Sequence, residues 1–114
     1  MESLEEIQRL ISEEFEIFDT WMDKYEHIID LGRQLEVFPK EQMIDENKIH
    51  GCQSSVWFLT SNEDGLFKCK ATSDSAIVSG LISLLLRIYD NQKPSEIVKQ
   101  EPKFISMIGL NEHL

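Results

Sequence analysis

The stretch VWFLTSNEDGLFKCKAT, residues 56–72, decides the fold because it has the pattern of a β-hairpin. Residues 56–60 are rich in side chains that favour strands. Residues 62–65 end in Asp-Gly, a pair typical of tight turns. Apolar and polar side chains then alternate over residues 66–72, as in a strand with one buried face. With a further short strand at residues 48–50, the sequence predicts a three-stranded antiparallel meander.

Helical patterns precede the hairpin. Ser3-Leu4-Glu5-Glu6 has the form of a capping box, and the apolar residues after it recur at helical spacing. A second helical pattern begins near Trp21, and Gly32 is expected to end it as a left-handed C-cap. We therefore expect two helices before the sheet.

Helix returns after the hairpin. The cluster Ser73-Asp74-Ser75 offers N-cap residues, and we assign this role to Asp74 in preference to acid catalysis. Residues 77–89 are apolar on more than one side and should form the buried spine of the domain. Pro94 suits the first turn of a short helix, and another apolar segment covers residues 104–110. The order of helices, strands and helices predicts an α+β fold, with helices packed on a small antiparallel sheet.

Length and charge restrict the class of protein. The 114 residues fit a single domain, residues 1–114, and 21 acidic against 11 basic residues give a net charge of −10. The whole excess lies in residues 1–46, which hold 14 acidic and 4 basic residues. Nucleic acid and anionic lipid attract cations, so neither is an expected partner. No apolar run approaches the roughly 20 residues of a membrane span, and the start lacks a signal peptide, so we expect a cytoplasmic protein.

The two cysteines occupy different settings. Cys69 lies within the alternating strand, on the same face as Phe67, and is interpreted as a small buried hydrophobe. Cys52 lies in the small, polar run Gly51-Cys52-Gln53-Ser54-Ser55, between two predicted strands. Gly51 could let another backbone come close to the thiol. Spacing alone leaves two interpretations of Cys52 open, a reactive loop thiol and a half-buried residue at a strand end.

Other thiol chemistry lacks the residues it needs. The sequence has no Cys-x-x-Cys pair, and Cys52 and Cys69 lie far apart with at most one nearby histidine, so a metal site is not expected. His50 would point parallel to Cys52 in an extended segment, which is a poor geometry for a catalytic pair. These considerations leave a single-thiol carrier or a single-thiol sensor.

The segment Gly51-Cys52-Gln53-Ser54-Ser55-Val56-Trp57 closely resembles the signature of the SufE family, the sulfur-acceptor proteins of iron–sulfur cluster assembly. Residues 21–35 resemble the second helix of this family, with its Leu-Gly ending. Residues 73–82 resemble its buried helix, and residues 94–97 the short helix that follows. Nearly the whole chain is covered, in three blocks that occur in the family's order.

The resemblance implies a role for each residue of the loop. Cys52 would be the catalytic residue that accepts sulfur, and Gly51, Gln53 and Ser54 would support the loop around it. The donor would be a pyridoxal-phosphate cysteine desulfurase, and the sulfur would pass on to an Fe–S scaffold complex. The protein would stimulate the desulfurase as its sulfur-transfer partner rather than act as a stand-alone enzyme, and it would need no cofactor of its own.

The length of the chain and its cysteine count bear on what the resemblance implies. Members of the family continue past the pair that corresponds to His113-Leu114 into a terminal helix, whereas the present sequence stops at that pair, and we expect either a truncated chain or a short form of the protein. The fold implied by the resemblance is shared with the NifU-type cluster scaffold, which needs several ligands where this chain has two cysteines. The alternatives are such a scaffold, or an acidic adaptor in which Cys52 carries no sulfur. The sequence does not decide whether the protein forms a homodimer.

Overall fold

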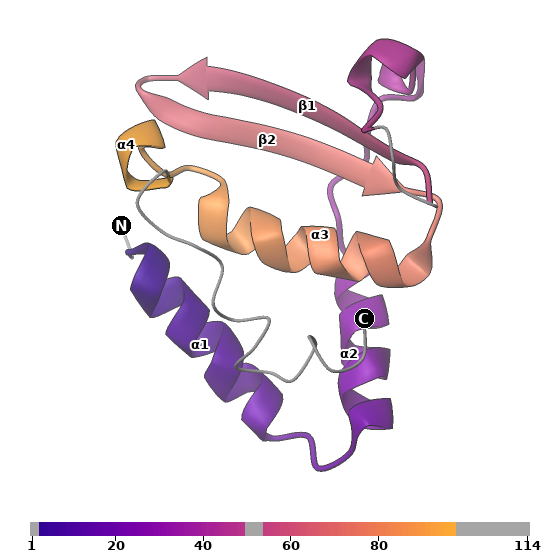
Figure 1. Cartoon of the computed structure of the whole chain (residues 1–114), viewed down its shortest axis with the longest axis vertical. Helices are drawn as coiled ribbons and strands as arrows, with labels where there is room; N and C mark the ends of the chain where they lie inside the picture. Colours follow the sequence, from indigo (N-terminus) through magenta and orange to yellow (C-terminus); the bar gives the residue numbers. More distant parts are fainter. Residues whose placement is uncertain (1–2, 50–53, 98–114) are drawn as a thin grey trace.

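A computed structural model describes residues 3–49 and 54–97 of the chain (Figure 1). Helices come first, then a pair of strands, then helices again, which confirms the predicted α+β class. The elements are α1 (Leu4–Glu16), α2 (Trp21–Arg33), the short 3-10 turns η1 (Lys40–Gln42) and η2 (Asp45–Asn47), β1 (Val56–Glu63), β2 (Leu66–Ser73), α3 (Ala76–Tyr89) and α4 (Pro94–Ile97).

The predicted hairpin is confirmed, and its first strand is longer than the predicted residues 56–60. β1 and β2 pair antiparallel over eight residues each, from Val56 opposite Ser73 to Glu63 opposite Leu66. Asp64 and Gly65 form the two-residue turn, with φ values of 56° and 78°. A type I′ turn requires positive φ at both central residues, and its twist matches the twist of the two strands. The Asp-Gly pair therefore fixes the register of the whole hairpin.

The prediction of a third strand was wrong. The sheet among the described residues has two strands, and the expected strand at residues 48–50 is reduced to an isolated bridge between Lys48 and Trp57. The physical reason is the hydrogen bond that closes η2, because the backbone N–H of Lys48 donates to the carbonyl oxygen of Asp45 at 3.1 Å and does not enter a ladder with β1.

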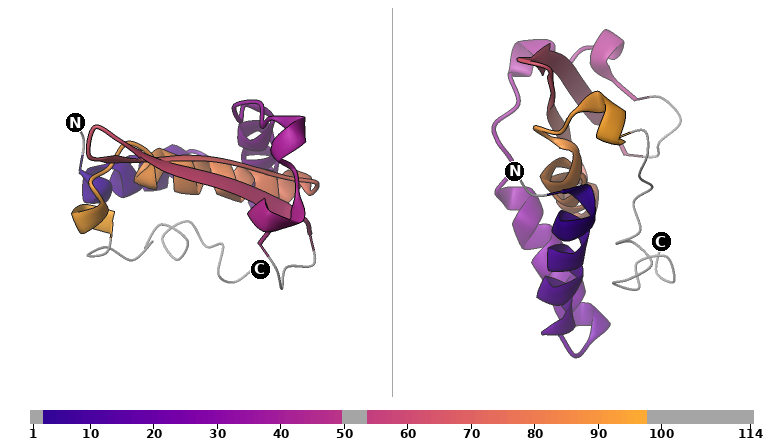
Figure 2. Two further views of the ribbon diagram at one scale, coloured as in Figure 1. Left: turned by 90° about the horizontal axis from the view of Figure 1, so that it is seen from above. Right: turned by 90° about the vertical axis from the view of Figure 1, so that its left-hand side faces the viewer.

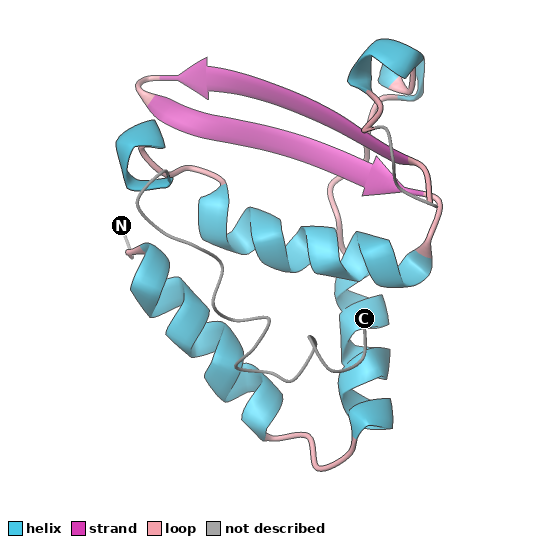
Figure 3. Ribbon diagram, viewed as in Figure 1, coloured by secondary structure: helices cyan, strands magenta, loops and turns pink. Residues whose placement is uncertain are grey.

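α3 lies against one face of the hairpin, and α1 and α2 lie beyond it on the side away from the strands (Figures 1 and 3). The view from above in Figure 2 also places the hairpin over α3. Leu84 and Ile88 of α3 are completely buried, which confirms its prediction as the spine. Two apolar clusters result. One joins α1, α2 and α3 through Leu4, Ile11, Phe15, Ile28, Leu84 and Ile88, and the other lies under the sheet and contains Val56, Ala71 and Ile82.

α2 and α3 cross at two glycines, and this corrects the prediction for Gly32. The residue does not end α2, which continues to Arg33 and is capped at Gln34. A Cβ on Gly32 would lie 2.7 Å from the backbone nitrogen of Gly80, and a Cβ on Gly80 would overlap the carbonyl oxygen of Ile28. Gly32 is therefore required for close approach of two backbones rather than for a left-handed conformation.

No helix in the described ranges is both long and apolar enough to cross a membrane.

Candidate functional site

The predicted reactive segment lies between two parts of the chain that the structure describes. Gly51, Cys52 and Gln53 are outside the described residues, and Ser54 is half-buried in a bend just before β1. Ile49 and Ser55 are the described residues on either side of this segment. Both ends are held by hydrogen bonds to neighbouring elements.

The incoming end is fixed to the start of β1. The backbone N–H of Ile49 donates to the carbonyl oxygen of Val56 at 2.9 Å, and Lys48 forms its bridge with Trp57. The ammonium of Lys48 also lies 5.9 Å from the centre of the Trp57 ring, within range of a cation–π interaction. The last two residues before the loop are thus placed by the sheet.

The outgoing end is fixed to the turn that precedes α3. The backbone N–H of Ser55 donates to a carboxylate oxygen of Asp74 at 3.0 Å. The carbonyl oxygen of Ser55 accepts from the hydroxyl of Ser73 at 2.8 Å and from the backbone N–H of Asp74 at 3.2 Å. Both backbone groups of Ser55 are therefore bonded, and residues 50–53 lie between two anchored positions.

The role predicted for Asp74 is corrected by these contacts. Ser75 is the N-cap of α3, because its hydroxyl accepts from the backbone N–H of Val78 at 3.4 Å. Asp74 instead bonds Ser55, at the outgoing end of the segment of residues 50–54 that we call the Cys52 loop. Ser73, Asp74 and Ser75 are all good N-cap residues, so the sequence does not show which of them caps α3. The pairing of Val56 with Ser73 in the hairpin is what brings Asp74 next to Ser55.

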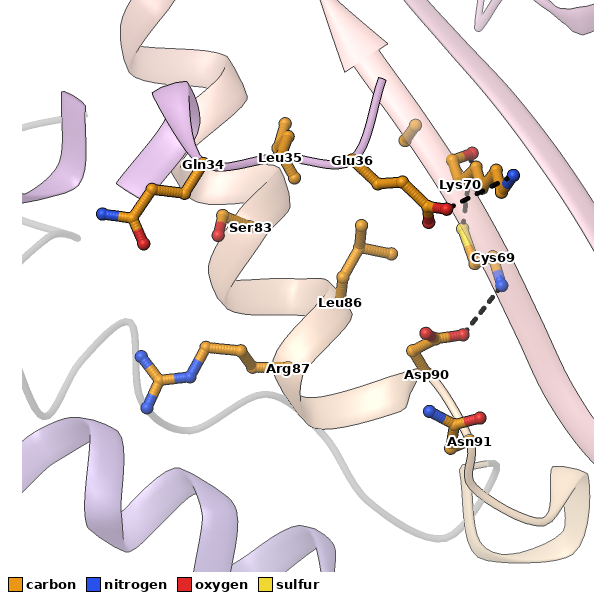
Figure 4. Close-up of a pocket in the computed structure, with 11 residues that line it drawn as sticks. Gln34, Leu35, Glu36, Cys69, Lys70, Ser83, Leu86, Arg87, Asp90 and Asn91 are labelled. Atoms are coloured by element: carbon orange, nitrogen blue, oxygen red, sulfur yellow. Dashed lines mark hydrogen bonds and ion pairs between the residues drawn. The ribbon is translucent and has the colours of Figure 1, made fainter. Parts of the chain in front are cut away.

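The second cysteine is confirmed as a buried residue of β2. The Cys69 side chain lies under the sheet, with 8% of the residue exposed. Its backbone N–H donates to a carboxylate oxygen of Asp90 at 2.9 Å (Figure 4). Burial, with a smaller contribution from the negative charge of Asp90, raises the pKa of the Cys69 thiol to about 12. A thiol in this state is not a nucleophile near neutral pH.

A cavity of about 350 Å³ opens beside Cys69, between the α2–η1 connection, β2 and the end of α3 (Figure 4). Glu36 and Lys70 face each other across its rim, with 3.5 Å between Nζ and Oε1. Within residues 3–49 and 54–97 no cluster of three or more His, Cys, Asp or Glu side chains could hold a metal ion. The cavity therefore offers neither a described metal centre nor an ionised thiol.

Comparison with known proteins gives consistent matches. The sequence model of the family described as "SufE: Fe-S metabolism associated domain" matches residues 9–114. A SufE-like protein of Rhizobium meliloti (strain 1021) is 38% identical over 109 residues, which cover 91% of this chain and 78% of that protein. A SufE-like protein of Rhizobium etli is 35% identical over 109 residues, covering 91% of this chain and 74% of its own length.

Proposed function

Because the chain belongs to the SufE family, which is associated with Fe–S metabolism, we propose that it is a sulfur acceptor whose reactive group is the thiol of Cys52. The sulfur donor is a pyridoxal-phosphate cysteine desulfurase that carries a persulfide on its own cysteine. The recipient is the scaffold complex on which Fe–S clusters are assembled. We place the protein in a reducing cytoplasm, which suits the free thiol of Cys69.

The transfer is a displacement at sulfur. The Cys52 thiolate attacks the outer sulfur of the donor persulfide, and a new S–S bond forms while the S–S bond on the desulfurase breaks. The electron pair of the broken bond leaves with the sulfur of the desulfurase cysteine, which becomes a thiolate. One sulfur atom changes carrier and no external oxidant or reductant is consumed. The rate depends on the thiolate fraction and on access, as in thiol–disulfide exchange.

The observation that carries this proposal is the state of the other cysteine. The chain has two cysteines, and Cys69 is buried with its pKa raised to about 12. This supports Cys52 as the proposed reactive thiol. The anchored ends at Ile49 and Ser55 support the proposal further, because fixed ends restrict where the loop between them can present a reactive group. Gly51, Gln53 and Ser54 are proposed to support the thiol within this loop.

Intact-mass measurement tests the proposal directly. We expect the protein, after incubation with a cysteine desulfurase and free cysteine, to gain the mass of one sulfur atom. Cys52→Ser should abolish this gain, whereas Cys69→Ser, the matched control at the other cysteine, should retain it. The proposal fails if the wild-type protein gains no sulfur, or if the adduct persists in Cys52→Ser.

A further inference from the structure

The face of the hairpin that packs on α3 is covered over only part of its area. Phe58 and Ala71 lie on this face as a directly opposed pair, and Thr60 follows Phe58 on the same side of β1. Ala71 is 2% exposed, whereas Phe58 is 37% exposed and Thr60 is exposed as well. α3 therefore shields β2 and leaves the part of β1 beyond Val56 open on its inner side.

A groove of about 420 Å³ lies at this incompletely covered part of the sheet. Figure 1 shows α4 at the end of the hairpin that carries its turn, so that three elements surround the groove. None of the residues that line it carries a charge. We call it the apolar groove. Its lining includes Phe58, Phe67 and Cys69 of the hairpin, Leu85 and Tyr89 of α3, and Ile97 of α4.

The chemistry of the apolar groove favours a polypeptide segment over a small molecule. Small-molecule sites are mostly apolar, but they carry a few precisely placed polar groups that orient the ligand. The side chains that line the apolar groove offer two such groups, the weakly polar thiol of Cys69 and the hydroxyl of Tyr89. An apolar segment needs no orienting groups, because removal of its surface from water is favourable in any orientation.

The chain itself provides an apolar segment close to the apolar groove. Ile97 is both a lining residue and the last described residue, and residues 98–103 separate it from Phe104. Five of the seven residues 104–110 are apolar, and residues 104–111 carry no charge in a chain that is 28% charged. Six extended residues span up to about 20 Å, so the segment can reach a groove that begins at Ile97.

The short connection favours this segment over another copy of the chain. A segment joined to its site by a short linker has an effective concentration in the millimolar range, so it outcompetes a second copy present at micromolar concentration. A second copy would also bring a net charge of −10 against an equal charge, which is unfavourable.

We propose that residues 104–110 of this chain occupy the apolar groove and cover the thiol of Cys69. The contact completes the layer that α3 begins on the inner face of the hairpin, and it buries Phe58. Cys69 is thereby kept from soluble reagents by a segment of its own chain as well as by the sheet. Occupancy of the groove does not depend on the role proposed for Cys52, because the two concern different thiols.

Nuclear Overhauser contacts in the full-length wild-type protein test the occupancy directly. We expect contacts from the methyl groups of residues 104–110 to the ring protons of Phe58, Phe67 and Tyr89. Absence of all these contacts from an assigned spectrum would overturn the proposal. A mixture of isotope-labelled and unlabelled protein identifies the source of the segment. Contacts found only between labelled and unlabelled copies would assign the groove to a second copy and would also overturn the proposal.

Alkylation of Cys69 by iodoacetamide at pH 8, followed by peptide mapping, tests the covering of the thiol. Phe104→Asp and Ile108→Asp should each raise the native rate at Cys69 roughly tenfold, because a carboxylate is too costly to bury in an uncharged groove and the segment then leaves it. The matched control is Asn111→Asp, which adds the same charge directly after the apolar run and should change the rate less than twofold.

Circular dichroism should show all three variants to be folded. A Cys69 alkylation rate in Phe104→Asp and Ile108→Asp that equals the wild-type rate would overturn the covering role of the segment. Sulfur uptake by Cys52 enters neither measurement, so the proposed function and the occupancy of the apolar groove can fail separately.

Discussion

The Asp74 carboxylate accepts a hydrogen bond from the backbone N–H of Ser55 at 3.0 Å, and so ties the start of α3 to the end of the Cys52 loop. The two residues are 19 positions apart, and the antiparallel register that sets Val56 opposite Ser73 brings them together. Asp74 is exposed, so this bond competes with water. Its expected role is to order the loop rather than to stabilise the fold as a whole.

Asp74→Ala should loosen the outgoing end of the loop. A hydrogen bond of this kind contributes about 1 kcal/mol net, so amide exchange at Ser55 should become roughly fivefold faster. Asp74→Asn keeps an acceptor oxygen and should retain most of the protection. The amide of Ile49, which bonds to Val56 at the other end, is the internal reference and should be unaffected in both variants. Unchanged exchange at Ser55 in Asp74→Ala would contradict a role for the Asp74 carboxylate in ordering this end of the loop.

Gly80→Ala should destabilise the protein even though alanine is normally the better residue in a helix. In an open position the change would add about 0.5–1 kcal/mol of stability. Here the added Cβ would overlap the carbonyl oxygen of Ile28, so α2 and α3 must move apart. We expect a loss of about 2–3 kcal/mol in the free energy of unfolding, measured with urea. The steric overlap outweighs the better helix propensity of alanine, so the free energy of unfolding should fall.

Ser83→Ala is the matched control for Gly80→Ala, because Ser83 lies one turn later in α3, beside the open cavity near Cys69. Its effect on the free energy of unfolding should stay within about 0.5 kcal/mol. A stabilised Gly80→Ala variant would mean that the two helices do not cross as closely as described.

Glu14 should make stability depend on pH in the acid range. Its carboxylate lies 2.7 Å from Nε2 of His27 and 3.1 Å from a guanidinium nitrogen of Arg87, and so links α1 to α2 and α3. Burial raises the pKa of Glu14, but the hydrogen bonds and charges of His27 and Arg87 outweigh it, and the net shift is downward from 4.5. A lowered folded-state pKa gives stability that is complete above the unfolded value and is lost as the pH falls through the folded value.

The comparison that isolates this effect is wild type against Glu14→Gln. At pH 7 the variant should be less stable by about 1 kcal/mol, since the linkage is partly exposed. Below pH 4.5 the difference should shrink, because protonated glutamic acid and glutamine then resemble each other. Urea unfolding at several pH values between 3 and 7 measures the difference. A gap that is constant over this range would contradict the linkage.

Features that depend on neighbouring residues, such as the hairpin turn and the burial of α3, were predicted correctly from the sequence. The Asp-Gly pair at Asp64 and Gly65 predicted the hairpin, because positive φ is needed at both positions. The dense apolar pattern of α3 predicted its burial. Gly32 was misassigned, because its reason is the approach of Gly80, 48 positions away along the chain, and no local pattern reports such a contact. The third strand was predicted wrongly because η2, directly before it, takes the backbone N–H of Lys48 into its own hydrogen bond with Asp45.

In the candidate site, too, the sequence predicted the feature that depends on neighbouring residues and missed the one that depends on a distant contact. Alternation along β2 was enough to predict that Cys69 is buried. Spacing left Cys52 undecided, and only the resemblance of its segment to a family signature assigned it a role. Asp74 was predicted as a cap because all three residues before α3 can cap a helix, whereas its bond to Ser55 depends on strand register.

The contrast between the two cysteines gives the final prediction. With its pKa near 12 rather than the ordinary 9.0, the Cys69 thiol is ionised roughly a thousandfold less often than in the unfolded chain at the same pH. Alkylation of Cys69 by iodoacetamide at pH 8 should be slower in the native protein by about this factor, and peptide mapping identifies the modified residue. In guanidinium chloride Cys69 should react at the rate of an ordinary thiol. Rapid native alkylation of Cys69 would return it to the set of candidate sulfur acceptors, because the assignment to Cys52 depends on this thiol being inert.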